Sequence, residues 1–288
     1  MSLKKQIDDL LFKSCRYFGK WGRKQGMSLQ YYHARHRWPD LDNPKDLSER
    51  ILSSMLKDSF LKFSDLADKV KVHEYIKSKG LEKILLKQYA VWENVDDISI
   101  DHLPDKFILK PNNGSGGHVY CRNKALFNLI EAKKYLKDNL MRAKDYFFEP
   151  HYLKIKPLVF AEELLDLGEG KVLTDYKFTC IKGEIVDVFL AGENDKGERK
   201  YATLDTEWNI LPYTKDDYAF STIPEKPTRL TEMVEYAKIL SKDFDFVRVD
   251  FYEHEGKVYF SELTFSPWGG YMFSYTDESI KKLGMLFD

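Results

Sequence analysis

An α/β or α+β fold with antiparallel sheets is predicted by two observations on this sequence. Segments with the period-two alternation of apolar residues that is typical of strands recur along the chain, and segments with helical spacing are interspersed among them. The 288 residues are 43% hydrophobic, which is enough to bury a substantial core in one large or two moderate domains. The chain contains no internal repeat and no low-complexity linker.

Helical spacing dominates the first eighty residues. Residues 3–20 and 46–63 are predicted to be helical, the second because Ile51, Met55 and other apolar residues recur three and four positions apart. Residues 65–80 predict a further helix whose end at Gly80 suits a glycine just beyond the last turn. The following elements are predicted in order: a strand in 83–92, a strand–loop–strand in 104–123 and a helix in 125–140.

The second half of the chain is richer in strands. Strand patterns are predicted in residues 156–165, 173–192 and 199–208. An amphipathic helix in 231–242 carries Met233, Ala237 and Leu240 on one face, and it leads into a hairpin over 247–263.

That hairpin, "VRVDFYEHEGKVYFSELTF", carries charged residues where strands favour apolar ones. Arg248 and Asp250 share one face of the first strand by alternation. An odd-numbered loop centred on Gly256 would place Asp250 opposite Glu262, whereas a two-residue turn would place these carboxylates on opposite faces. Facing carboxylates are destabilising unless neutralised, so the first register favours a bound divalent cation. The alternative is a solvated sheet face with ordinary charges.

A glycine-rich loop, "NNGSGG", lies at residues 112–117 and follows a strand that ends in Lys110. Its backbone N–H groups could close around phosphates. The loop lacks the Lys-Ser/Thr of a Walker A motif, and a strand rather than a helix follows it, unlike in a Rossmann fingerprint. A plain hairpin loop is the alternative.

Composition limits the class of protein. The three cysteines (Cys15, Cys121 and Cys180) form no CxxC pair, which argues against a disulfide scaffold or a thiolate zinc site and favours a reducing cytosol. No secretory signal or run of roughly 20 apolar residues is present, so a cytoplasmic protein is expected.

Net charge is −1, but residues 1–38 hold nine basic residues against two acidic ones, together with aromatic residues such as Tyr17, Phe18, Trp21 and Trp38. Such a segment could lie on the inner face of an anionic membrane or contact glycan-assembly machinery. The favoured alternative packs the aromatic rings on the protein body and leaves the lysines in water. No nucleic-acid-binding module accompanies the segment, so a nucleic-acid partner is not expected.

Several short motifs, in order, resemble the ATP-grasp superfamily and, within it, the TupA-like branch named from teichuronopeptide biosynthesis. These are "NPKDLSER", "DKVKVHEYI", "LPDKFILKPNNGSGG", "DYKF" and "RVDFYEHEGKVYFSELTF", which run from about Asn43 to the C-terminus. The resemblance implies an α+β ATP-grasp fold, in which two subdomains clasp ATP, with a helical N-terminal extension. The implied boundaries are 1–64 for the extension, 65–160 for a lid-bearing subdomain and 161–288 for a metal-binding subdomain.

The resemblance also implies site residues. ATP would be bound by lysines, the glycine-rich loop, a hinge strand and a ribose or phosphate contact: Lys69, Lys110, Gly114, Ser115, Gly116, Gly117, Glu162, Glu163, Leu165 and Asp175. Lys177 and Arg248 would act on the transferring phosphoryl group, and Mg²⁺ would be held by Asp250, Glu262 and Thr264. Thr264 stands where most ATP-grasp enzymes have asparagine, and a hydroxyl is a weaker ligand than an amide oxygen.

The implied reaction is ATP-dependent activation of a carboxylate as an acyl-phosphate, followed by amide formation with an amine. Kinship with polysaccharide assembly suggests a uronic acid and an amino acid or amino sugar. Alternatives are a sugar or small-molecule kinase, a glycosyltransferase, and a non-catalytic ATP-binding protein. Further substrate-side candidates near the metal end are Ser266, Trp268, Gly269, Gly270, Tyr271 and the Arg199-Lys200 pair, with packing as the alternative for Trp268. His118, Cys121 and Cys180 are expected to be structural.

Overall fold

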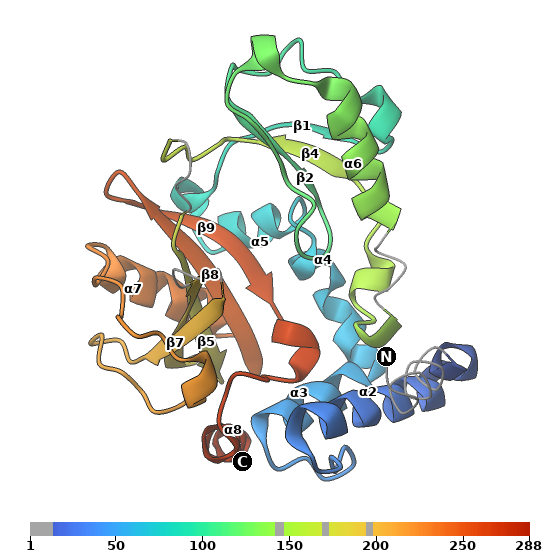
Figure 1. The fold of residues 1–288 in the computed structure, drawn as a ribbon, viewed down its shortest axis with the longest axis vertical. Coiled ribbons are helices and arrows are strands. Elements are labelled where there is room, and N and C mark those ends of the chain that lie inside the picture. Colours follow the sequence, from blue (N-terminus) through green and yellow to red (C-terminus); the bar gives the residue numbers. More distant parts are fainter. Residues whose placement is uncertain (1–13, 142–146, 169–172, 194–197) are drawn as a thin grey trace.

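The computed structural model describes residues 14–141, 147–168, 173–193 and 198–288, and it consists of two antiparallel sheets with helices around them (Figure 1). No helix among the described residues combines the length and the apolar character needed to cross a bilayer. The mixed helices and antiparallel sheets confirm the predicted α+β class.

The smaller sheet has the strand order β1-β4-β2-β3. Its strands are β1 (Gln88–Trp92), β2 (Phe107–Pro111), β3 (Val119–Cys121) and β4 (Val159–Glu162). Helix α6 (Leu129–Met141) packs on it, and Figure 1 shows this helix beside the sheet at the top of the molecule. Phe107, Leu109, Leu136 and Val159 form the centre of a separate apolar core between the sheet and the helix.

The larger sheet has the order β7-β6-β5-β8-β9. Its strands are β5 (Asp175–Ile181), β6 (Glu184–Glu193), β7 (Arg199–Leu204), β8 (Phe246–His254) and β9 (Lys257–Thr264). Helix α7 (Leu230–Ser241) covers one face through Met233, Ala237 and Leu240, as its predicted amphipathic pattern requires. The predicted strands and this helix are confirmed.

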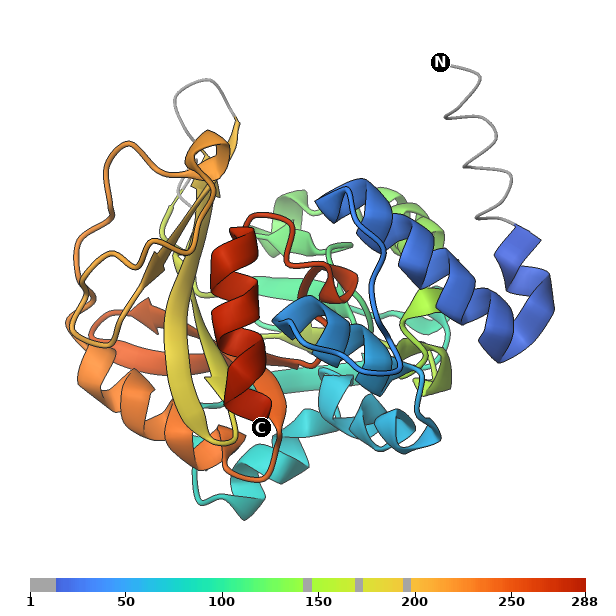
Figure 2. The same ribbon diagram turned by 90° about the horizontal axis from the view of Figure 1, so that it is seen from below.

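Helices from both ends of the chain join the core of the larger sheet. These are α2 (Gly19–Arg35), α3 (Leu47–Met55) and α8 (Asp277–Gly284), and Figure 2 shows α3 and α8 side by side. Asp46 and Glu49 form a capping box that starts α3. Met27, Tyr31 and Leu52 of these helices belong to the same buried cluster as the sheet residues.

Several helical predictions need correction. The helix expected over 65–80 is two short helices, α4 (Ser64–Ala67) and α5 (Val72–Ser78). The Asp68 carboxylate interrupts the helix because it accepts hydrogen bonds from the backbone N–H groups of Val70, at 2.9 Å, and Lys71, at 3.3 Å. The end near Gly80 is confirmed, since this glycine has a φ of +71° just beyond α5. In the 46–63 segment, α3 ends at Met55 and a 3₁₀ helix (Asp58–Phe63) follows.

Residues 3–13 of the predicted 3–20 helix lie outside the described residues. From residue 16 a 3₁₀ turn (Arg16–Phe18) leads into α2, which extends to Arg35 where no helix was predicted. Tyr31 is buried as expected, but Tyr17, Trp21 and Trp38 are 87%, 63% and 62% exposed. The favoured prediction that the aromatic rings pack on the body is therefore wrong for these three and for Phe18, which is 59% exposed. Tyr17, Phe18 and Trp21 lie in α2 and the turn before it, at the edge of the molecule (Figure 2), and Trp38 lies beyond the end of α2.

Candidate functional site

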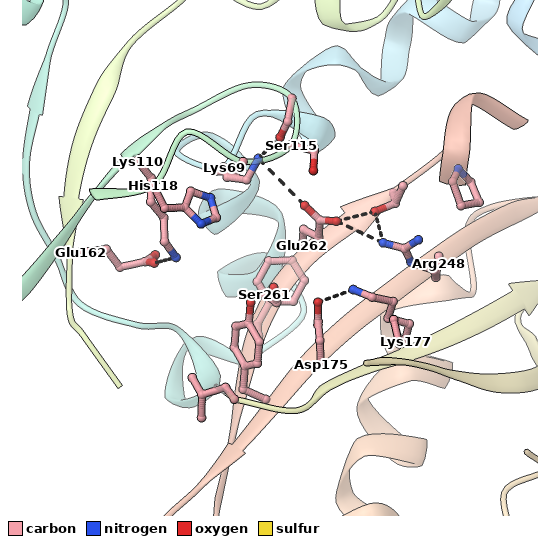
Figure 3. Close-up of a pocket in the computed structure, with 18 of the residues that line it drawn as sticks. Lys69, Lys110, Ser115, His118, Glu162, Asp175, Lys177, Arg248, Ser261 and Glu262 are labelled. Carbon is pink, nitrogen blue, oxygen red and sulfur yellow. Dashed lines mark hydrogen bonds and ion pairs between the residues drawn. The ribbon is translucent and has the colours of Figure 1, made fainter. Parts of the chain in front are cut away.

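A cavity of about 950 Å³ is lined by residues of both sheets and of the loops between them. Its lining includes most of the residues implied by the resemblance: Lys69, Lys110, Gly114, Ser115, Gly116, Glu162, Leu165, Asp175, Lys177, Arg248, Glu262 and Thr264. Figure 3 shows Lys110 and Glu162 at one side, Arg248 and Lys177 at the other, and Glu262 between Lys69 and Arg248. Segments that are 193 positions apart in sequence, Lys69 and Glu262, thus meet in one cavity.

A bulge in the β8–β9 hairpin determines which charges face this cavity. The turn has two residues, Glu255 and Gly256, and both have positive φ. Asp250 nevertheless lies opposite Glu262, because the register shifts between Asp250 and Phe251 and leaves Ser261 unpaired. The sequence reasoning treated the short turn and the facing carboxylates as exclusive alternatives. The bulge makes both true.

The facing carboxylates are held by cations. Arg248 donates from Nε and Nη2 to the two oxygens of Asp250 at 2.7 and 2.6 Å, and Nη2 lies 3.2 Å from Glu262 Oε1. Lys177 Nζ lies 2.8 Å from Asp250 Oδ2 and also bonds Asp175. Asp250 has no exposed surface, so this pairing replaces the water that an ionised carboxylate would otherwise need.

The pKa values reflect this pairing. Burial raises the pKa of Glu262, but Lys69, Arg248 and Lys177 outweigh it and bring the pKa to about 2. Burial lowers the pKa of Arg248, yet Asp250 and Glu262 outweigh it and the net shift is upward. Burial raises the pKa of Asp175 to about 6 against the opposing charge of Lys177. Glu262 and Arg248 are therefore both charged at neutral pH.

A second set of contacts ties the two lysines to the glycine-rich loop and the small sheet. Lys69 N–H donates to the Asn112 carbonyl at 2.9 Å, and Lys69 Nζ donates to the Gly114 carbonyl at 2.5 Å. Lys110 Nζ lies 2.6 Å from Glu162 Oε2 on the neighbouring strand. Gly114 and Gly116 have φ of +66° and +80°, a region that side-chain-bearing residues rarely adopt. Two ammonium groups thus lie under an open backbone loop.

Three implied residues do not line the cavity. Gly117 packs against α6 and β2, since a Cβ there would lie 3.0 Å from both Asn139 and Pro111. Glu163 is one position from Glu162, so it faces the other side of the strand, where its carboxylate accepts a 3.4 Å hydrogen bond from Lys87 N–H. Asp250 lies behind Arg248 and Lys177 and is covered by them.

Oxygen donors on β9 fit a divalent cation. Thr264 Oγ1 lies 2.9 Å from Glu262 Oε1, and both residues line the cavity. Among the described residues no three histidine, cysteine or acidic side chains are grouped to hold a metal ion. Mg²⁺ commonly takes only one or two carboxylates and completes its shell with waters and substrate phosphate oxygens, so this donor set suits it.

The end of the cavity beyond Arg248 pairs Ser266, a predicted substrate-side candidate, with Glu149, which the sequence reasoning missed. Glu149, in the segment before β4, lines the cavity, and its Oε1 accepts a 2.6 Å hydrogen bond from Ser266 Oγ. Ser266 begins a 3₁₀ turn (Pro267–Gly270) that packs on α3, where a Cβ on Gly270 would lie 3.1 Å from Ile51. Glu149 follows an aperiodic stretch, so no pattern in the sequence pointed to it.

The remaining candidates differ in whether their side chains are available to a substrate in the cavity. Trp268 lines the cavity but packs edge-on against Phe189, with ring centroids 4.6 Å apart, which supports the packing interpretation. Arg199 lines the cavity, whereas Lys200 Nζ turns away to the Asp217 carbonyl at 2.9 Å. His118 also lines the cavity, and burial together with Lys110 and Lys69 lowers its pKa to about 3. Cys121 and Cys180 are buried free thiols, as expected of structural residues.

Comparison with known proteins gives a family match over most of the chain. A family model described as TupA-like ATPgrasp matches residues 49–288. No curated protein matches the sequence.

Solved structures with a similar fold are distant. The D-alanine–D-alanine ligase of Helicobacter pylori is 17% identical over 77% of this chain and 60% of its own, with a TM-score of 0.42. The L-amino acid ligase of Bacillus licheniformis is 16% identical over 69% of this chain and 42% of its own, with a TM-score of 0.43. The chain therefore spans less than two thirds of the length of these ligases.

Proposed function

The chain belongs to the TupA-like ATP-grasp family, and we propose that it is an ATP-dependent ligase that joins a carboxylate to an amine. The observation that carries this proposal is the cluster of Arg248, Lys177 and Glu262, which faces Lys69 and Lys110 across one cavity. Transfer of a phosphoryl group requires cations around its oxygens, fixed before the reaction begins. The cavity supplies four of them.

In the proposed reaction, a carboxylate oxygen attacks the γ-phosphorus of ATP, ADP leaves, and an acyl-phosphate forms. Lys69 and Lys110 neutralise the α- and β-phosphates, while Arg248 and Lys177 stabilise the oxygens of the group in transfer. The loop around Gly114 closes over the phosphates and excludes water from the acyl-phosphate. Glu162 and the Leu165 backbone bind the adenine side.

The hydrogen bonding of Asp175 supports its proposed contact with the ribose or a phosphate of ATP. One of its oxygens bonds Lys177, and the other, Oδ1, is buried and has no partner among the described residues. A buried acceptor without a donor costs free energy, which a ligand hydroxyl would recover.

Mg²⁺ would be held by Glu262 and Thr264, and by Asp250 once Arg248 and Lys177 turn from it to the phosphoryl group. When bound, the ion would supply charge neutralisation across the β- and γ-phosphates. Gly117 and Glu163 have no direct part in this proposal, since neither lines the cavity.

We propose a uronic acid of a surface polysaccharide, or its nucleotide-sugar precursor, as the carboxylate, and an amino acid or amino sugar as the amine. The support for this finer statement is the resemblance to teichuronopeptide biosynthesis. Arg199, exposed at the cavity wall, is suited to a second anionic group of such a substrate.

The test is ADP release by the purified protein with ATP and Mg²⁺, against UDP-uronic acids with and without amino acids. A ligase requires both a carboxylate and an amine, and Asp250→Asn and Glu262→Gln should abolish release. Amine-independent ADP formation with a stable phosphorylated product would instead indicate a kinase. Absence of release with every pair would contradict this substrate assignment.

For the N-terminal region we propose peripheral contact with an anionic membrane. Tyr17, Phe18 and Trp21 are exposed, and basic residues flank them. Exposed rings beside positive charge are typical of helices that lie in a bilayer interface. Flotation with vesicles of phosphatidylglycerol should carry the protein, whereas phosphatidylcholine vesicles and the Phe18→Ala/Trp21→Ala variant should not. Equal flotation on both lipids would contradict the proposal.

A further inference from the structure

We propose that Glu149 and Ser266 form the amine subsite of the cavity, where the Glu149 carboxylate binds the ammonium group of the acceptor and removes its proton. This inference rests on the proposed ligase function and deepens it. It gives the amine a binding site, which the phosphate-binding residues do not supply.

The first observation is that Glu149 is an acid without a cation. Ser266 Oγ donates to it at 2.6 Å, and no lysine, arginine or histidine in the described part of the chain forms an ion pair with it. Burial raises its pKa to about 7, and the hydrogen bond from Ser266 only partly opposes this. A half-buried carboxylate that lines a cavity and has no cation beside it is suited to a cationic ligand.

The second observation is the place of Glu149 relative to Arg248. Ser266 follows Thr264 by two residues, and Thr264 Oγ1 lies 3.2 Å from Arg248 Nη2. Arg248 also lies over the Trp268 ring, with its guanidinium carbon 5.8 Å from the ring centre. The Ser266–Trp268 segment therefore links the phosphoryl-transfer cluster to Glu149, so an amine at Glu149 would approach the side where the acyl-phosphate forms.

The third observation is that the two residues before Glu149 are anchored on α2. The Phe147 carbonyl accepts a 2.8 Å hydrogen bond from Arg23 Nε of α2. The Phe148 ring occupies the space that a side chain on Gly26 would need, since a Cβ there would lie 2.3 Å from the ring. The Tyr271 hydroxyl is buried without a partner in the described residues, and burial, then the charge of Glu149, raises its pKa.

The acceptor arrives as R–NH₃⁺, gives one proton to the Glu149 carboxylate and becomes R–NH₂. Its lone pair forms the C–N bond with the acyl carbon, and the C–O bond to phosphate breaks with its electron pair on the phosphate oxygen. The second proton leaves nitrogen with the departing phosphate, and Glu149 returns its proton to solvent.

Binding of amines tests the subsite without requiring turnover. D-glucosamine, L-lysine and glycinamide would be titrated calorimetrically into the protein saturated with Mg²⁺ and a non-hydrolysable ATP analogue. At least one amine should bind, and Glu149→Gln should weaken that binding at least tenfold. The control is Glu235→Gln, at an exposed position of α7, and it should leave the binding unchanged. Failure of all three amines to bind wild type, or equal binding by Glu149→Gln, would overturn the proposal.

Turnover tests the proton transfer. Hydroxylamine is already unprotonated at neutral pH, so it needs no base to trap an acyl-phosphate as a hydroxamate. Glu149→Gln should lose at least a hundredfold in amide formation with an ordinary amine, and far less in hydroxamate formation. Equal losses with both nucleophiles would overturn the role of Glu149 as a base.

Ser266→Ala separates positioning from catalysis. It should raise the KM for the amine with little change in kcat and leave the KM for ATP unchanged, since Ser266 acts by orienting Glu149. A wild-type protein that forms neither ADP nor hydroxamate with any carboxylate would contradict the proposed ligase, while the amine titration would still decide the subsite.

Discussion

The two ends of the cavity differ in whether their acidic side chains are paired with cations. At the phosphate end every acid has a cation: Asp250 is bonded by Arg248 and Lys177, and Glu262 by Arg248 with Lys69 3.9 Å away. At the other end the Ser266 hydroxyl is the one hydrogen-bond partner that Glu149 has within the part of the chain that the structure describes. The first arrangement lowers the pKa of Glu262 to about 2, and the second raises that of Glu149 to about 7.

This difference indicates which kind of ligand each end of the cavity is suited to bind. Paired charges are already neutral as a group, and they can receive a phosphate with a metal ion without large rearrangement. An unpaired buried acid costs stability in the empty protein, and a cationic ligand recovers that cost. The comparison therefore predicts opposite consequences for removing an acid at the two ends.

The largest effect is expected from Asp250→Ala at the paired end. It leaves Arg248 and Lys177 buried without their shared counter-ion, which should lower the free energy of unfolding by about 3–5 kcal/mol. ADP release should fall by about a thousandfold, because both cations lose their orientation. Urea unfolding and an ADP assay measure the two losses.

Asp243→Asn is the matched control for that loss. Asp243 pairs with Lys79 at 2.6 Å, but its side chain is 53% exposed. Exposed pairs contribute at most about 1 kcal/mol, so this variant should remain close to wild type in stability and activity. Equal destabilisation by the two substitutions would remove the distinction between buried and exposed pairing.

Glu149→Gln should have the opposite effect on stability. The pKa of this carboxyl is about 7 in the folded protein against an ordinary 4.5, so the unfolded chain loses its proton first as pH rises. Wild-type stability is therefore lost between these pH values, by up to about 3 kcal/mol at pH 8. The variant lacks this loss.

Urea unfolding of the wild type and of Glu149→Gln at pH 5 and pH 8 measures this pH-dependent loss of stability. The advantage of Glu149→Gln over wild type should grow toward pH 8, and Glu235→Gln should show no such growth. A constant difference would mean that Glu149 is not held in an unfavourable environment.

Amide formation with an amine and hydroxamate formation with hydroxylamine should also differ in their pH dependence. With Glu149 as the base, amide formation should rise about fiftyfold from pH 5 to pH 7 as its carboxyl ionises. Hydroxamate formation, normalised to the concentration of unprotonated hydroxylamine, should rise far less over that range, because this nucleophile needs no base, Glu262 titrates near pH 2 and Arg248 remains charged. Parallel profiles for the two nucleophiles would show that one group governs both steps.

The smallest effect is expected at Thr264. Thr264→Ala removes a hydroxyl that bonds Glu262 at 2.9 Å, and it should raise the Mg²⁺ concentration for half-maximal ADP release about tenfold. Thr264→Asn should restore or improve Mg²⁺ binding, since an amide oxygen is the stronger ligand. An unchanged Mg²⁺ requirement in both variants would exclude Thr264 from the metal site.

Local sequence patterns predicted much of this arrangement. Alternation located the β8–β9 hairpin, and the glycine-rich loop after Lys110 pointed to the phosphate end. The bulge at Ser261 could not be predicted, because it is a tertiary adjustment that no turn rule contains. Glu149 was missed for a similar reason: its place depends on Phe148 packing at Gly26 of α2, a contact across more than a hundred residues.

Transfer of oxygen isotope tests the central claim most directly. A uronic acid labelled with ¹⁸O in both carboxylate oxygens would be incubated with ATP, Mg²⁺ and an amine, and the released phosphate analysed by mass spectrometry. An acyl-phosphate route predicts one ¹⁸O in inorganic phosphate for each amide formed. Amide formation with unlabelled phosphate, or labelled product that retains both oxygens and a phosphoryl group, would contradict the proposed ligase.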